Sequence, residues 1–174
     1  MLSLRCAVGI VLAIAFVFGM PDLGSLSIVG SPAYAASSSA IRTVDELSDA
    51  EKDFSSQSFV EREFIGERLE RANFSGANLR GTVFSGSTLD GANFHGADLS
   101  DALMYTTNLK NTDLTDANLT GVMLLQTNLD GADITGADFS YSTIDKNQLL
   151  KLCKRASGVN SVTGVDTRES LECR

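Results

Sequence analysis

The sequence has few of the residues that metal and catalytic sites use most often. It contains one histidine, His95, and three cysteines, Cys6, Cys153 and Cys173, among 174 residues. A zinc site needs a second pair of ligands close to the first, and His95 lies far along the chain from the two C-terminal cysteines. No phosphate-binding glycine loop is present, since the glycines recur at intervals of five. We therefore predict no metal, no cofactor and no small-molecule ligand.

Apolar runs of membrane-spanning length are also lacking. The apolar run over residues 7–20 has fourteen residues, too short for a mature transmembrane helix but suited to the h-region of a signal peptide. Arg5 precedes it, and Ala33-Tyr34-Ala35 offers small residues where a signal peptidase cleaves. With neither a twin-arginine pair nor a lipobox cysteine present, we predict a Sec-type signal peptide over residues 1–35, cleaved before Ala36.

An uncleaved membrane anchor is the alternative for this N-terminal segment. The spacer between the apolar run and the cleavage motif, from Pro21 to Pro32, is longer than usual. No charged stop-transfer cluster follows the run, however, and this favours cleavage.

Basic residues are in the minority. The chain has 14 Lys and Arg against 22 Asp and Glu, a net charge of −8. Removing residues 1–35 leaves this charge unchanged, because Arg5 and Asp22 are lost together. A mildly acidic surface argues against nucleic acid and anionic lipid as partners.

Cleavage would leave two cysteines in an exported chain. Cys6 is lost with the signal peptide, and Cys153 and Cys173 remain, twenty residues apart. Because exported proteins fold in oxidising compartments, this pair predicts a single disulfide.

The middle of the chain is organised by a repeat of five residues. From Phe54 to Ile144 every fifth residue is Phe, Leu, Ile or Met, at nineteen positions without exception. Two residues before each, from Ala72 to Ser142, the residue is always Ala, Ser, Thr or Val. Asn or Asp often precedes the large residue, where a short polar side chain can form a hydrogen bond with the neighbouring backbone. Gly recurs at the expected corners, where φ is expected to be positive.

A period of five fits neither a helix nor a strand. It fits a chain that turns a corner every five residues, so that four sides make a square coil of twenty residues. Residues twenty apart then stack in ladders, of which one is Phe54, Phe74, Phe94, Leu114 and Ile134. The sequence predicts an all-β solenoid, a quadrilateral β-helix of nearly five coils over residues 54–144.

The quintets carry a family resemblance. The pattern Ala-Asn-Leu-X-X, as in Ala77-Asn78-Leu79-Arg80-Gly81 and Ala117-Asn118-Leu119-Thr120-Gly121, resembles the pentapeptide repeat family. This resemblance implies a right-handed quadrilateral β-helix, and members of the family often have no assigned activity. With its export signal and its two-cysteine tail, the chain is similar to the thylakoid lumenal pentapeptide proteins. In those, a disulfide-closed helical segment caps the last coil, which the resemblance implies for Cys153 and Cys173.

Both flanks of the repeat are predicted to form short α-helical caps. Thr43-Val44-Asp45-Glu46 fits a capping box at the start of a helix running toward Asp53, within a leader and N-terminal cap over residues 36–53. Asp145 can N-cap a helix carrying Leu149, Leu150 and Leu152, and Asp166 begins a second. These two helices and the disulfide make up the predicted C-terminal cap, residues 145–174.

One wall of the coil departs from the polar pattern of the outward positions. Its apolar residues recur at twenty-residue spacing and are Ile65, Val83, Leu103, Tyr105, Met123 and Leu125. Such a stripe on an otherwise polar surface suggests a docking face for a protein partner or for weak self-association of a monomer. A terminal segment folded back over the stripe is the alternative.

No catalytic residue is predicted. His95 is expected at an outward position between Ser and Thr, with no carboxylate and hydroxyl pair organised around it. We therefore expect a non-enzymatic exported scaffold or protein-interaction module. The resemblance implies the thylakoid lumen, with the periplasm as the alternative, and a lumenal or membrane complex as the partner.

A second function class is a DNA-mimicking protein that binds a topoisomerase. That function would need a strongly negative surface. The column Glu70, Asp90, Lys110 and Asp130 is interrupted by a cation, so this alternative ranks below the interaction module.

Overall fold

The computed structural model describes residues 52–174. They belong to one compact unit, Ala40–Arg174. The predicted signal peptide lies outside this range. Almost all of the helix predicted between the capping box at Thr43 and Asp53 lies outside it as well.

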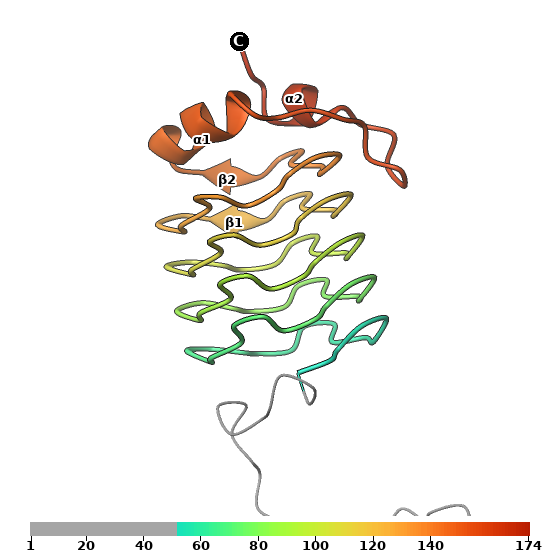
Figure 1. The fold of residues 1–174 in the computed structure, drawn as a ribbon, viewed down its shortest axis with the longest axis vertical. Helices are drawn as coiled ribbons and strands as arrows, with labels where there is room; N and C mark the ends of the chain where they lie inside the picture. Colours follow the sequence, from blue (N-terminus) through green and yellow to red (C-terminus); the bar gives the residue numbers. More distant parts are fainter. Residues whose placement is uncertain (1–51) are drawn as a thin grey trace, which may run out of the picture. The chain divides into compact units, whose positions relative to one another are not determined.

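The chain from Asp53 to Asp145 winds into stacked parallel coils (Figure 1). Bridges join residues twenty positions apart, from Asp53↔Asn73 to Asn118↔Asp138. Two short strands, β1 (Met123–Leu124) and β2 (Thr143–Ile144), pair in parallel with the same offset. The extended segments are short because the chain turns at every fifth residue. Several backbone hydrogen bonds still join each side to the next coil, as from Phe74 to Asn93 at 2.7 Å, from Gly76 to His95 at 2.8 Å and from Asn93 to Ala72 at 2.9 Å.

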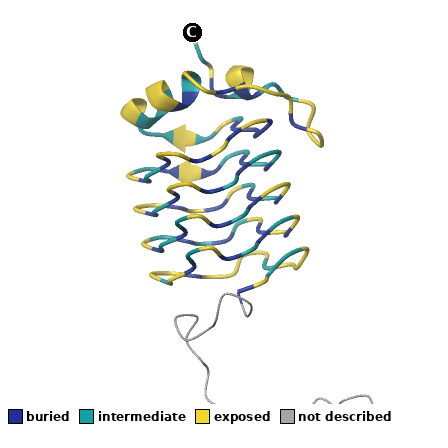
Figure 2. Ribbon diagram, viewed as in Figure 1, coloured by how far each residue is buried: buried dark blue, intermediate teal, exposed yellow. Residues whose placement is uncertain are grey.

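The large residues of the repeat fill the interior of the coil. All of them from Phe64 to Phe139 are buried, and Phe54, Phe59 and Ile144 at the two ends are partly buried. Aromatic rings stack between coils, with centroids 5.1 Å apart for Phe74 and Phe94. Figure 2 shows the result, with buried residues along the inside of the coils and exposed ones outside. The predicted ladders are confirmed.

The small inward residues have a second role beyond leaving room for large ones. The hydroxyl of Thr82 donates to the carbonyl of Phe59 at 3.0 Å, and that of Thr107 to the carbonyl of Phe84 at 3.0 Å. Ser87 and Thr127 donate in the same way to Phe64 and Met104. Buried hydroxyls therefore bond the preceding coil, a role for Ser and Thr at positions where other quintets carry Ala.

Two local predictions about the quintet are also confirmed. Glycines two residues after a large residue have positive φ, for example Gly86 at 75° and Gly131 at 76°. The Asn or Asp before a large residue accepts a bond from the amide two residues later, as between Asn93 and His95 at 2.9 Å. These Asx turns recur on several walls and hold each corner in place.

Helix α1 (Lys146–Cys153) and helix α2 (Thr167–Ser170) follow the last coil. Asp166 caps α2 through its side chain, which accepts from the amides of Arg168 and Glu169. Asp145 precedes α1, but the prediction that its side chain caps the helix is wrong. Its carboxylate instead accepts from the amide of Gln126 at 2.6 Å. The Asp145 carbonyl, which the ladder would offer to that amide, accepts from the Leu149 amide of α1.

Neither α1 nor α2 has the length and apolar character that crossing a lipid bilayer would require, and the same holds for every helix in residues 52–174.

Candidate interaction face

The apolar residues of one wall form two adjacent columns. Bridges Val83↔Leu103 and Leu103↔Met123 stack the first column directly. In the second column, the amide of Thr106 donates to the carbonyl of Leu125 at 3.0 Å, which sets Leu125 above Tyr105. We call these five residues, with Ile65, the apolar face: Ile65, Val83, Leu103, Tyr105, Met123 and Leu125.

The apolar face is open to solvent. Ile65, Tyr105, Leu103 and Met123 are 59%, 44%, 41% and 38% exposed, and Val83 and Leu125 are half-buried. The C-terminal segment leaves these side chains exposed, so it is not their cover. The remaining alternative, an N-terminal cover, falls on residues outside the described range.

Ile65 is set apart from the rest of the apolar face. Hydrogen bonds from Gly66 to Ser85 at 3.1 Å and from Gly86 to Tyr105 at 3.0 Å place Ser85 between Ile65 and Tyr105. The contiguous part of the apolar face is therefore the group around Leu103. Ile65 lies nearer the N-terminal end of the coil, separated from that group by Ser85.

The repeat itself does not require apolar residues here. Val83, Leu103 and Met123 stand directly before a large residue, where other walls carry Asn or Asp in Asx turns. Each apolar residue gives up such a hydrogen bond, typically about 0.5–1.5 kcal/mol. The apolar face is thus a feature that coil stability alone does not explain.

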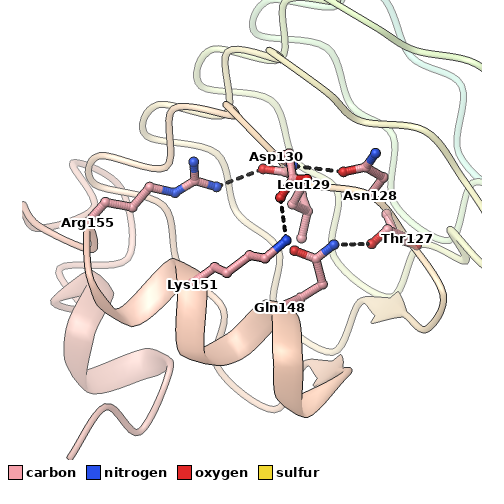
Figure 3. Close-up of polar contacts among 7 residues, drawn as sticks. All are labelled: Thr127, Asn128, Leu129, Asp130, Gln148, Lys151 and Arg155. Carbon is pink, nitrogen blue, oxygen red and sulfur yellow. Dashed lines mark hydrogen bonds and ion pairs between the residues drawn. The ribbon is translucent and has the colours of Figure 1, made fainter.

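Helix α1 closes the exposed edge of the last coil (Figure 3). The amide side chain of Gln148 donates to the carbonyl of Thr127 at 3.0 Å, and Arg155 donates to the carbonyl of Leu129 at 2.7 Å. Lys151 forms an ion pair with Asp130 at 2.8 Å, and this hydrogen bond lowers the pKa of the Asp130 carboxyl. These contacts satisfy carbonyls at an edge that would otherwise invite association with another chain.

The chain after α1 returns along the side of the coils. The amide of Gly136 donates to the carbonyl of Ser157 at 2.8 Å. Asn160 is buried, and its side chain donates to the carbonyls of Asp116, Ala117 and Gly136 at 3.0, 3.2 and 2.9 Å. Sequence reasoning missed Asn160, because one Asn in a tail without a repeat carries no periodic signal.

Gly158 lets this returning segment approach the coil. Its φ is +88°, and an added Cβ would lie 2.8 Å from the amide nitrogen of Gly136. We expect Gly158→Ala to lower the free energy of unfolding by about 2 kcal/mol, through backbone strain and a displaced tail. Urea denaturation followed by circular dichroism measures this.

Gly164→Ala is the matched control for that substitution. Gly164 also has positive φ, +73°, but nothing lies within 4 Å of an added Cβ. We expect Gly164→Ala to lower the free energy of unfolding by about 1 kcal/mol, from the backbone conformation alone. Equal losses for the two variants would show that the close approach to Gly136 contributes nothing.

Cys153 and Cys173 are brought together at the end of the molecule. Their sulfurs are 1.97 Å apart and their Cα atoms 5.5 Å apart. The bond links the last residue of α1 to the chain just beyond α2. It thereby ties the two ends of the C-terminal segment together over the last coil.

His95 has a more organised surrounding than we predicted. Its Nδ1 lies 2.7 Å from the hydroxyl of Thr115, which in turn donates to Asp113 at 2.6 Å. The expectation of no carboxylate and hydroxyl pair near His95 is therefore wrong, because stacking places Thr115 one coil above it. Since the Thr115 proton goes to Asp113, Thr115 accepts from His95, and the imidazole is not placed to activate this hydroxyl as a nucleophile.

The described range contains no group of three or more His, Cys, Asp or Glu residues that could hold a metal ion.

Comparison with known proteins agrees with the repeat. The family model for pentapeptide repeats matches eight copies, over residues 68–104 and 107–142. A solved pentapeptide repeat protein from the thylakoid lumen of Arabidopsis thaliana is 33% identical, covering 74% of this chain and 95% of that one, with a TM-score of 0.39. The chain belongs to the pentapeptide repeat family.

Two further relatives align with a smaller share of this chain. The thylakoid lumenal protein TL20.3 of Arabidopsis thaliana chloroplasts is 60% identical over 38 residues, 22% of this chain and 14% of that protein. A solved pentapeptide repeat protein from Nostoc is 26% identical, covering 57% of this chain and 80% of that one, with a TM-score of 0.43. The chain thus matches only a small part of TL20.3.

Membership of the family accounts for the coil but not for the apolar face. Leu103, Tyr105 and Met123 lie within or beside the matched residues, yet they replace the polar residues that the quintet usually carries there. The apolar face is therefore a departure from the quintet pattern that the rest of this coil follows.

Proposed function

We propose that this pentapeptide repeat protein is a non-enzymatic scaffold of the thylakoid lumen that docks a partner protein through its apolar face. The thylakoid lumenal relatives support the location, for which the periplasm is the alternative. The proposal includes export by a cleaved signal peptide over residues 1–35.

The same proposal assigns the remaining parts of the chain. Residues 36–53 form a leader and N-terminal cap, and nearly five coils follow over residues 54–144. Residues 145–174 form a helical cap closed by the Cys153–Cys173 disulfide. The parallel bridges and α1 and α2 support this division.

One observation carries the docking function. Leu103 and Met123 are about 40% exposed at positions where an Asn or Asp would stabilise the coil through an Asx turn. Neither coil stability nor the C-terminal segment accounts for them. A contiguous exposed apolar group of this kind is typical of a protein interaction site.

The double variant Leu103→Asn with Met123→Asn tests this function. It restores the Asn of the repeat, so we expect the free energy of unfolding to stay equal or rise by about 1 kcal/mol. Partner binding should fall at least about tenfold, because central apolar contacts dominate interfaces. Quantitative affinity capture from a thylakoid lumen extract measures binding, and circular dichroism measures folding.

Asn118→Leu is the matched control, since Asn118 holds the equivalent position on another wall. It should lose stability and keep the partner. Unchanged capture by the folded double variant would contradict the proposal. A destabilised double variant would indicate that the apolar face packs against the protein's own chain.

The DNA-mimic alternative gains no support from the stacked acidic column. Hydrogen bonds from Gly91 to Lys110 at 2.8 Å and from Asn111 to Asp130 at 3.0 Å place Lys110 between Asp90 and Asp130. Lys151 also pairs with Asp130. Two cations thus interrupt the negative column that such a function would need.

A further inference from the structure

A groove of about 520 Å³ lies between the last coil, α1 and the chain after α2. Its walls include the apolar side chains of Phe139, Ile144, Leu149 and Leu171. Ile144 stands directly above the buried Leu124 in the β1–β2 pair, whereas the exposed Thr143 stands above Met123 of the apolar face. The groove therefore lies at the end of the coil interior, on the far side of Thr143 from the apolar face.

The rim of the groove carries an aromatic residue that the fold does not favour. Tyr141 is 91% exposed and has a φ of 58°. Among residues 52–174 it is the only aromatic with positive φ, and Gly121 occupies the same corner one coil below. A bulky side chain at such a position is strained, and its full exposure means that packing does not offset the strain. Leu150, 56% exposed, adds a second apolar group to the rim.

The rim is also basic. Lys146 and Arg174 line the groove with one acidic residue, Glu172. Helix α1 contains no Asp or Glu, in contrast to the coils, whose outward carboxylates give the chain its negative charge. The chain as a whole has a net charge of −8. The groove in its C-terminal cap nevertheless favours an anionic occupant.

We infer that this groove binds an acidic segment of the partner protein, with one apolar side chain inserted between α1 and the last coil and carboxylates beside Lys146 and Arg174. This inference rests on the proposed docking function and extends the interface beyond the apolar face. A protruding side chain can enter a groove of about 520 Å³, whereas a flat lipid headgroup surface does not. Tyr141 then covers the inserted segment from the rim, as exposed aromatics do at interface hot spots.

Two substitutions test the inference without disturbing the fold. Tyr141→Gly places glycine at a positive φ, which favours folding. Lys146→Glu places an acidic residue in the first turn of α1, where the helix dipole favours it. The bait is the full mature chain, and the probe is a phage-displayed library of short random peptides. The strongest enriched peptide is then synthesised with a fluorescent label for polarisation measurements.

We expect enriched peptides to combine Asp or Glu with Phe, Leu or Trp. Each variant should bind the labelled peptide about tenfold more weakly, and the affinity of the unchanged protein should fall with salt. Leu103→Asn with Met123→Asn should bind the peptide unchanged, because the groove lies beyond those residues. If this double variant keeps the lumenal partner while Tyr141→Gly and Lys146→Glu weaken peptide binding, the proposed function fails and the inference stands. If the double variant loses the partner while Tyr141→Gly and Lys146→Glu bind the peptide unchanged, the inference alone fails.

Three results would overturn the inference. The first is enrichment of peptides without acidic residues, and the second is equal affinity for the unchanged protein and both variants. The third is co-sedimentation of the protein with phosphatidylglycerol vesicles that Lys146→Glu abolishes, which would assign Lys146 and its surroundings to a membrane surface.

Discussion

Phe94→Ala is expected to lower the free energy of unfolding by about 4 kcal/mol, the largest effect of any single substitution considered. Phe94 is fully buried, its ring stacks on Phe74 at 5.1 Å, and it meets Phe84 edge-on at 6.1 Å. The coil cannot collapse onto the cavity, because parallel backbone bonds hold neighbouring coils at a set spacing of about 4.8 Å. The resulting void therefore stays open, and its lining loses contacts.

Urea unfolding monitored by circular dichroism measures this loss. Phe94→Leu is the control, because Leu114 already occupies the next position of the same ladder, and we expect it to cost about 1 kcal/mol. A loss below about 1 kcal/mol for Phe94→Ala would mean that the stacked ladder contributes little to stability.

Removal of the disulfide is the second large effect. The bond closes a loop of sequence separation 20. By constraining the unfolded chain, a bond across such a loop raises the free energy of unfolding by about 3 kcal/mol. Without it, α2 is still held on the last coil by Ser170 Oγ, which accepts from the amide of Phe139 at 3.0 Å, and the chain beyond α2 by the hydrogen bond from the Cys173 amide to the carbonyl of Arg168 at 3.0 Å. We expect Cys153→Ser with Cys173→Ser to lose about 3 kcal/mol.

The measurement compares thermal and urea unfolding of the unchanged protein with and without dithiothreitol. The double serine variant is the control and should not respond to the reductant. Thiol labelling of the native protein gives the decisive readout. Free Cys153 and Cys173 thiols would contradict both the disulfide and the oxidising compartment.

The repeat explains why so much of the coil could be predicted. A residue's neighbours above and below lie twenty positions away, so a fivefold period specifies the stack, the ladder of Phe54, Phe74 and Phe94, and the outward position of Leu103. The Asx turns and positive-φ glycines are equally local, since each depends on one quintet. The pairing of Cys153 with Cys173 was predictable for a different reason, because only these two cysteines lie outside the predicted signal peptide.

The C-terminal segment shows what sequence reasoning could not reach. Asp145 carries the pattern of a helix cap, yet its carboxylate accepts from the Gln126 amide, because the start of α1 takes the Asp145 carbonyl. His95 approaches Thr115 only because the coils stack. The side chain of Asn160 donates to three carbonyls because the chain turns back along the coils after α1. No periodicity in the sequence indicates that reversal.

The sequence by itself determined the coil, its core and the apolar character of one wall, because a repeat turns local pattern into long-range register. Only the tertiary structure decided that this wall is left exposed by the C-terminal segment and that a separate groove lies between the last coil and α1. Those features depend on how α1 and the chain after it settle on the last coil. That packing is set by unpaired backbone groups at the end of the stack, which the sequence does not display.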